Sequence, residues 1–377
     1  MPYERLYENT MNRVTRVIRV DPARPDPAAI EEGATALRDG KLVAFPTETV
    51  YGLGANALDE RAVQSIFEAK QRPANDPLIV HIAHIGQLNL CAAHVPAAAR
   101  RLGLAYWAGP LTMILPKRPA IPDVVTAGLG SVAVRVPAHR VARALMEMFG
   151  VPVAAPSANR FSRPSPTSAA HVLDDLDGRV DLIIDGGPTE IGLESTIVDF
   201  TVEPPALRRP GGLTLEQIRV VIPEVQAVAQ HSAADRPQLA PGQLARHYAP
   251  RATLTLYEGE AGPLVDQLGA DIRTATAQGE RVGILAPEED LMALAPVIAA
   301  AAAAGRVDVR PYGSRRDPAR AARELFGALR DLDATGVTVI FATALGPNGL
   351  GPAIRDRLVR AAEGKVRTAG SSGTRGT

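Results

Sequence analysis

The fold is decided by residues 42–54, which read LVAFPTETVYGLG. Residues 42–45 are apolar and predict a buried strand, which Pro46 breaks. Hydroxyl side chains, Tyr51 and two glycines come next, where core packing alone would favour none of these residues. The stretch therefore predicts a ligand site at the end of a buried strand.

The next part of the chain adds two positive charges to this site. A predicted helix ends in Lys70 and Arg72 and is stopped by Pro73, and a second apolar strand follows at residues 78–82. An ammonium group and a planar guanidinium together suit a polyphosphate better than a single carboxylate. Two basic residues alone more often complement the C-terminal end of a helix. The pair is informative only together with its surroundings.

Composition sets broad limits on the function. The chain has 377 residues, enough for two or more domains with their own cores. Its 41 basic residues balance 41 acidic ones, so the net charge indicates no strong affinity for nucleic acid or an anionic membrane. Cys91 lies in an apolar helical pattern and is expected to be a buried structural thiol. Without paired cysteines, an apolar leader or a long uncharged apolar run, we expect a soluble, cytoplasmic protein.

The hydrophobic pattern divides the chain into four parts. In residues 13–224 helices and strands alternate irregularly, which predicts an α/β domain with a twisted mixed sheet. Residues 225–250 lose the periodicity and are expected to form a linker. Residues 251–365 alternate regularly, which predicts a smaller α/β domain with a parallel, Rossmann-like sheet. Residues 366–377 are rich in Gly, Ser and Thr and are expected to be a disordered tail.

The end of the linker carries Arg246, His247 and Tyr248, which a passive spacer does not need. We expect this piece to dock on the protein. It would act either as a lid that closes over the active site and excludes water, or as a strut between domains. The sequence leaves these two alternatives open.

Common nucleotide and zinc signatures are absent from the sequence. No Gly-x-x-x-x-Gly-Lys-Ser/Thr occurs, and the match of Gly52, Gly54 and Ala57 to a dinucleotide-binding pattern follows a broken strand, so we interpret it as accidental. The seven histidines never fall in zinc-ligand spacing with a cysteine or another histidine. We therefore expect no dedicated metal ligands.

What remains is a set of ligand-holding, non-nucleophilic groups at the ends of predicted elements. Singly, each has a commoner structural role: Ser157 and Asn159 as turn or cap residues, and His81 as a core histidine. Only their combination points to a site. The set consists of Thr47, Tyr51, Lys70, Arg72, His81, Ser157, Asn159, Ser195 and Arg209.

The order and spacing of these residues form a known pattern. The motifs are PTETVYGL at residues 46–53, KQRP at 70–73, PLIVH at 77–81, PSAN at 156–159, ESTIV at 194–198 and RPG at 209–211. Together they resemble the YrdC-like threonylcarbamoyl-AMP synthases. The resemblance covers roughly residues 27–223, and the linker and second domain resemble the long, two-domain branch, whose linker also carries a His-Tyr pair. Residues before Arg13 are unmatched, and Met11 is an alternative start.

The resemblance implies an open concave cleft and a reaction without a covalent enzyme intermediate. L-Threonine and bicarbonate would give N-carboxythreonine, whose carboxylate attacks the α-phosphate of ATP, with Mg²⁺ accompanying the nucleotide, and releases pyrophosphate. The product would serve N6-threonylcarbamoyladenosine formation at position 37 of tRNAs that read ANN codons, through a downstream transfer complex. Positioned cations and hydrogen-bond donors suffice for this route.

The resemblance also distributes the roles of the site residues. Lys70, Arg72, Ser157 and Asn159 would be catalytic and bind ATP, together with Arg209, His247 and Tyr248. Thr47, Tyr51, His81, Thr112 and Ser195 would bind threonine.

Two alternatives stay open at this point. An RNA-binding module of the same fold predicts a basic, aromatic-bearing surface and salt-dependent affinity for tRNA. A carbamoyl-adenylate-forming domain of another maturation pathway, such as hydrogenase maturation, would accompany a cysteine zinc finger, which Cys91 alone cannot form.

Overall fold

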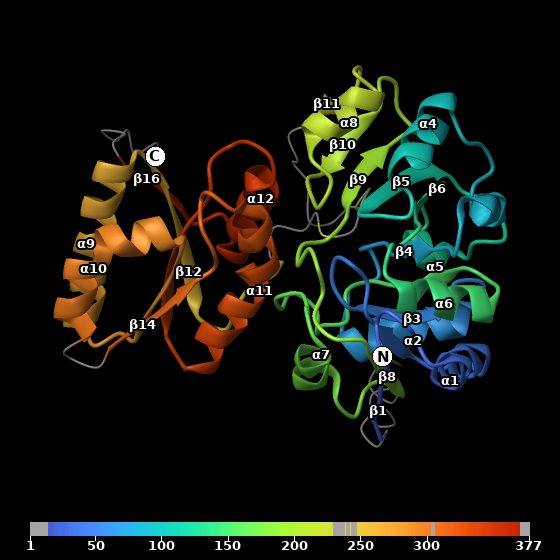
Figure 1. Cartoon of the computed structure of the whole chain (residues 1–377), viewed down its shortest axis with the longest axis horizontal. Helices are drawn as coiled ribbons and strands as arrows, with labels where there is room; N and C mark the ends of the chain where they lie inside the picture. Colours follow the sequence, from blue (N-terminus) through green and yellow to red (C-terminus); the bar gives the residue numbers. More distant parts are fainter. Residues whose placement is uncertain (1–13, 229–237, 239–241, 243–246, 303–305, 370–377) are drawn as a thin grey trace, which may run out of the picture. The chain divides into compact units, whose positions relative to one another are not determined.

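The computed structural model of the chain describes residues 14–228, 238, 242, 247–302 and 306–369. Its contacts divide the chain into two compact units. Unit 1 comprises the described parts of Met1–Phe161 and Ser165–Leu244, and unit 2 comprises Ser162–Pro164 and the described parts of Ala245–Thr377. Figure 1 shows the elements of both units.

Unit 1 is built on an eleven-stranded mixed sheet with the strand order β1-β8-β2-β3-β7-β4-β6-β5-β9-β10-β11. Some neighbours are parallel, such as β4 and β6, and others antiparallel, such as β5 and β6. The predicted mixed sheet is thus confirmed. The strands are β1 Arg16–Arg19, β2 Val43–Phe45, β3 Gly52–Asn56, β4 Ile79–His81, β5 Leu111–Pro116, β6 Ser131–Arg135, β7 Val153–Ala154, β8 Leu182–Asp185, β9 Thr196–Asp199, β10 Ala206–Arg209 and β11 Gln226–Ala227.

The helices of unit 1 include the one that presents the predicted cations. The Asp59 side chain caps α2 by accepting from the backbone N–H of Arg61 at 2.9 Å, and Gln71 ends the helix in the left-handed conformation with φ 54°. Lys70 is therefore the last helical residue. The helices are α1 Pro27–Arg38, α2 Glu60–Lys70, the 3-10 helix η1 Ile85–Gln87, α3 Leu88–Cys91, α4 Ala97–Tyr106, α5 Asp123–Thr126, α6 Arg140–Phe149, α7 Ala169–Leu176 and α8 Leu215–Val221.

Unit 2 contains a five-stranded sheet, and all its pairings are parallel, as predicted. The order is β14-β13-β15-β12-β16, with β12 Thr253–Gly259, β13 Val282–Ala286, β14 Val307–Pro311, β15 Val339–Thr343 and β16 Val366–Ala369. Helices α9 Ala261–Ala277 and α10 Glu288–Ala302 cover one face, and α11 Pro318–Ala334 and α12 Gly351–Ala361 cover the other (Figure 1).

One boundary was predicted wrongly. Residues 366–369 were assigned to a disordered tail, but they form β16, which pairs with β12 from Leu256↔Val366 to Gly259↔Ala369. The strand completes the hydrogen bonding of β12, which would otherwise be an open sheet edge. The remainder of the expected tail, residues 370–377, lies outside the described residues.

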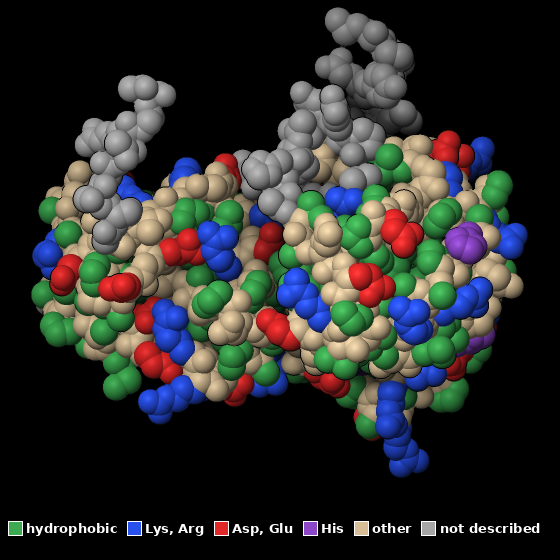
Figure 2. Space-filling view, turned by 90° about the horizontal axis from the view of Figure 1, so that it is seen from above, with side chains coloured by type: hydrophobic (Ala, Val, Ile, Leu, Met, Phe, Trp, Pro, Cys, Tyr) green, Lys and Arg blue, Asp and Glu red, His purple; other side chains and the backbone are tan. Residues whose placement is uncertain are grey.

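The core and surface agree with the composition. Cys91 is fully buried and unpaired, and burial raises the pKa of its thiol to about 12, which confirms a structural thiol. None of the described helices combines the length and apolar character that a membrane crossing demands. On the face shown in Figure 2, Lys and Arg side chains are scattered among acidic and apolar ones.

Candidate functional site

One face of the unit 1 sheet carries a row of polar side chains. His81 on β4 lies opposite Arg135 on β6, and Arg135 lies opposite Thr112 on β5. Side chains two residues further along the same strands belong to the same face, because strand side chains alternate. Three such residues, together with one from β9, form an apolar cluster separate from the main core. This cluster, called the apolar floor below, consists of Ile79, Ile114, Ala133 and Ile197.

Two buried hydroxyl groups lie at the edge of this floor. Thr112 Oγ1 and Ser195 Oγ are 2.8 Å apart, and each residue is at most 1% exposed. Arg209 Nη2 donates to Ser195 Oγ at 3.2 Å, and its Nε donates to the Ser195 carbonyl at 3.1 Å. The structure thus brings Thr112, Ser195 and Arg209 together as one hydrogen-bonded cluster. Such paired hydroxyls can bind a ligand hydroxyl.

His81 is a neutral imidazole in this environment. Its ring is 3% exposed and meets Phe45 edge-on at a centroid distance of 6.4 Å. Burial, reinforced by the positive charge of Arg135, lowers the pKa of His81 to about 3. Nδ1 lies 3.3 Å from the carbonyl of Ile79. The ring can therefore offer a neutral donor or acceptor to a ligand.

Thr47 and Tyr51 use their hydroxyls within the protein. Thr47 Oγ1 donates to the carbonyl of Val50 at 2.7 Å and accepts from the N–H of Thr49 at 3.1 Å, which closes the turn after β2. Tyr51 Oη donates to the carbonyl of Gly187 at 2.6 Å, and burial raises the pKa of its hydroxyl. Both residues therefore shape the loop, and neither hydroxyl stands free.

Sequence reasoning missed a buried ion pair beside this loop. Arg135 Nη2 lies 2.7 Å from Glu48 Oε1, with both side chains 4% exposed, and Arg135 Nη1 donates to Thr49 Oγ1 at 2.8 Å. The pair ties the loop after β2 to the middle of the sheet. The available signal was Arg135 itself, a charged residue directly after the apolar run Val132–Val134.

The PSAN motif encloses the amine of Lys70. Lys70 Nζ donates to the carbonyl of Ser157 at 2.6 Å and to that of Asn159. The side chain is 1% exposed, and burial, followed by the charge of Arg72, lowers the pKa of Lys70 well below its usual value. The anti bridge between Gly52 and Ser157 brings this motif beside β3. The structure thus unites three of the predicted catalytic residues.

Arg72 lies two residues beyond Lys70, and its side chain folds back along the chain. Nε donates to the carbonyl of Asp76 at 3.0 Å, and Nη2 donates to that of Pro77 at 2.9 Å. Arg72 is 8% exposed. These bonds fix the orientation of the guanidinium, whose positive charge acts on the Lys70 amine.

The His-Tyr pair of the linker belongs to unit 2. Tyr248 has a φ of 60° and is 1% exposed. Its ring centroid lies 5.3 Å from that of Phe326 and 5.4 Å from the guanidinium carbon of Arg357. The His247 ring lies 4.0 Å from the Tyr248 ring. Arg246 lies outside the described residues. The roles of His247 and Tyr248 in nucleotide binding stay predictions.

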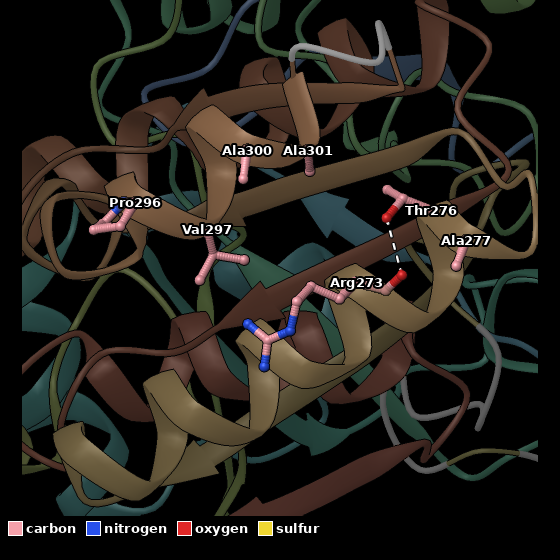
Figure 3. Close-up of a pocket in the computed structure, with 7 residues that line it drawn as sticks. All are labelled: Arg273, Thr276, Ala277, Pro296, Val297, Ala300 and Ala301. Atoms are coloured by element: carbon pink, nitrogen blue, oxygen red, sulfur yellow. Dashed lines mark hydrogen bonds between the residues drawn. The ribbon is translucent and has the colours of Figure 1, made fainter.

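Unit 2 also contains a pocket of about 460 Å³ between α9 and α10 (Figure 3). It is largely apolar, with Arg273 on one side, and it contains none of the predicted site residues.

Within the described part of the chain, no group of three or more His, Cys, Asp or Glu side chains could hold a metal ion.

Comparisons with known proteins identify the family of the chain. A family model described as telomere recombination, the Sua5/YciO/YrdC domain, matches residues 35–211, and the model of the threonylcarbamoyl-AMP synthase C-terminal domain matches residues 213–363. The chain is 46% identical over 334 residues to the threonylcarbamoyl-AMP synthase of Pyrococcus abyssi, covering 88% of this chain and 93% of that protein. It is 44% identical over 338 residues to that of Bacillus subtilis, covering 89% and 94%.

A solved structure matches both units. The crystal structure of P. abyssi Sua5 complexed with L-threonine superposes with a TM-score of 0.85 at 43% identity and covers 94% of this chain and 99% of that one. The chain therefore belongs to the threonylcarbamoyl-AMP synthase family, in its two-domain form.

Proposed function

We propose that this chain condenses L-threonine, bicarbonate and ATP into threonylcarbamoyl-AMP and pyrophosphate on the concave face of unit 1. As a member of its family, the chain is a transferase that forms an adenylate for tRNA modification. The observation that carries the assignment of the site is the enclosure of the Lys70 amine by the Ser157 and Asn159 carbonyls, next to Arg72.

Threonine would bind over the apolar floor. The Thr112–Ser195 hydroxyl pair would hydrogen-bond the substrate hydroxyl, while the floor contacts the γ-methyl group. His81, neutral at physiological pH, would line the same pocket together with the loop shaped by Thr47 and Tyr51. A site that hydrogen-bonds the hydroxyl rejects valine strongly, whereas a missing methyl group costs serine only about 1–3 kcal/mol.

ATP would bind with its phosphates among Lys70, Arg72 and Arg209, with Ser157 and Asn159 alongside. A carboxylate oxygen of N-carboxythreonine forms a bond to the α-phosphorus, and the bond from that phosphorus to the bridging oxygen breaks, so that pyrophosphate leaves with its electrons. No side-chain nucleophile takes part, and the cations stabilise the developing negative charge. The incoming phosphates would also raise the lowered pKa of Lys70 and keep its amine protonated.

The nucleotide would arrive as its magnesium complex. An ATP-using synthase needs a divalent metal, and Mg²⁺ is the ion we propose, bound to phosphate oxygens and water. Bicarbonate would supply the carbamoyl carbon. The adenylate would then pass to a complex that transfers the threonylcarbamoyl group to position 37 of tRNA, with no strong direct binding of nucleic acid by this chain.

For the linker we propose a lid. Arg246, His247 and Tyr248 would close over the bound nucleotide and shield the labile adenylate from water. The support is chemical: a carbamoyl-adenylate hydrolyses readily, and a buried His-Tyr pair whose rings meet edge to face is an unusual composition for a spacer.

Pyrophosphate release tests the proposal. We expect release that requires ATP, threonine and bicarbonate together and no RNA, and we expect Lys70→Ala to abolish it. Lys41→Ala, a change of an exposed lysine before β2, is the control and should retain full activity. Release that requires tRNA, or a Lys70→Ala variant with unchanged kinetics, would overturn the assignment.

A further inference from the structure

Asp76 is a fully buried carboxylate next to the cations assigned to ATP. It is 0% exposed, and its Oδ2 lies 2.9 Å from Nη2 of Arg72. The same guanidinium donates to the backbone carbonyls of Asp76 and Pro77. Both the carboxylate and the backbone carbonyl of Asp76 therefore contact Arg72. These contacts fix the orientation of the Arg72 guanidinium.

The charge of Asp76 acts on more than one cation. Burial raises its pKa, while Arg72, then the N–H of Gly242, then Lys70 and Arg209 lower it. All three cations of the proposed phosphate site thus lie within electrostatic reach of this carboxylate. An acid at such a site would repel phosphate, so its presence calls for a role that outweighs the repulsion.

The linker reaches the same short loop. The backbone N–H of Gly242 is close enough to the Asp76 carboxylate to lower its pKa, and the N–H of Gln238 donates to the carbonyl of Asn75 at 3.0 Å. Gln238 is 1% exposed, and Gly242 has a φ of 77°, a conformation that favours glycine. Both linker residues therefore dock within unit 1, on the loop that follows Arg72.

We propose that Asp76 is a positioning residue for ATP, which orients Arg72 and ties that orientation to the docked linker at Gly242. The inference rests on the proposed placement of the phosphates at Lys70 and Arg72. Asp76 touches no reacting atom. It keeps Arg72 and the linker in the arrangement that receives the nucleotide, so its loss affects ATP and leaves threonine binding intact.

The test separates the two substrates. Asp76→Ala is expected to raise KM for ATP about tenfold through loss of the ion pair that orients Arg72, and to change KM for threonine less than about twofold. Asp76→Asn retains the shape of the side chain and one oxygen facing Arg72, and it is expected to recover part of the ATP affinity. Equal changes in both KM values, or no change in either, would overturn the inference. If Asp76→Ala fails to fold, Asp76→Asn decides, with a KM for ATP raised by at least about twofold expected.

A matched control is available in the same unit. Asp199, at the C-terminal end of β9, is 1% exposed, and its Oδ2 lies 2.8 Å from Nη2 of Arg208, so Asp199→Asn breaks a comparable ion pair. It should lower Tm without separating the KM values. A separation as large as that of Asp76→Asn would show that loss of stability alone causes the effect.

A double-mutant cycle tests whether Asp76 acts together with Gly242 of the linker. Gly242→Ala strains the left-handed backbone and should raise KM for ATP, and the double variant with Asp76→Ala should be no worse than Asp76→Ala within about twofold. Additive effects would contradict the link. Lys70→Ala with an unchanged KM for ATP would instead remove the proposed function. If Lys70→Ala impairs ATP use and Asp76→Ala does not, only the present inference fails.

Discussion

At the scale of single residues, threonine selection depends on the hydroxyl pair of Thr112 and Ser195. Both groups are buried and 2.8 Å apart, so removal of one leaves the other with an unmet hydrogen bond. We expect Ser195→Ala to raise KM for threonine about 5- to 30-fold and KM for ATP much less. Steady-state kinetics with each substrate varied in turn measures this.

The control is Ser65→Ala, which removes a hydroxyl on the exposed side of α2 that bonds only the Arg61 carbonyl at 3.2 Å. It should leave both KM values unchanged. Equal effects of Ser195→Ala on threonine and ATP would contradict the placement of threonine at the hydroxyl pair.

Acid should destabilise the protein partly through His81. Its pKa is about 3 when folded, below the 6.5 of a free histidine. Between these values the unfolded chain binds a proton that the folded chain excludes, so stability from this group is complete above pH 6.5 and falls as the pH drops towards 3. The slope contributed is at most about 1.4 kcal/mol per pH unit.

Denaturant unfolding at a series of pH values checks this expectation. His81→Gln, which does not titrate, should show a shallower loss of stability between pH 6.5 and 4.5 than the parent chain. The exposed His84→Gln is the control and should follow the parent. Parallel curves for His81→Gln and the parent would show that His81 is not the group responsible.

The sequence predicted some features of the residue scale better than others. The motifs identified Lys70, Ser157 and Asn159, which the structure brings together. They did not reveal that the hydroxyls of Thr47 and Tyr51 donate hydrogen bonds to backbone carbonyls, because such bonds depend on turn geometry. They also did not reveal the Arg135–Glu48 pair, because its partners are 87 residues apart.

At the scale of elements, the local signals of α2 worked well. Asp59 marks its start, and the helix ends at Lys70, just before Arg72 and Pro73. The strands that are short or rich in glycine were harder. No strand was predicted at β3, because its backbone pairing with β2 depends on tertiary context that a Gly-Leu-Gly sequence does not carry.

Strand β16 gives a prediction at this scale. Ending the chain after Gly364 removes the residues that pair with β12 and exposes its edge. We expect a Tm several degrees lower and a greater tendency to aggregate. Ending the chain after Ala369 is the control, because it retains the β12–β16 ladder. Equal Tm values for the two truncated chains would show that β16 contributes nothing to stability.

At the scale of the whole molecule, the two-unit organisation followed from a change in periodicity near residue 225 and from the family motifs. The family models match residues 35–211 and 213–363, so the second match begins before the predicted linker. The linker was harder to interpret, since its docking on unit 1 depends on an isolated backbone hydrogen bond from Gln238 to Asn75. Composition carries no record of such contacts.

Cutting the linker tests its role as a lid. A chain that ends near residue 234 keeps the proposed substrate residues of unit 1 but loses Gly242, His247 and Tyr248. We expect slower turnover and faster hydrolysis of the adenylate, measured as the lifetime of the product in solution with enzyme present. Unchanged turnover and product lifetime would leave the linker as a strut.

The most direct test of the central claim is mass spectrometry of the products formed from ATP, bicarbonate and one amino acid at a time. With threonine we expect threonylcarbamoyl-AMP and pyrophosphate in equal amounts. Serine should give its adduct about 10- to 200-fold less efficiently, and valine should give far less again. Absence of an adenylate with threonine, or equal yields from threonine and valine, would contradict the account.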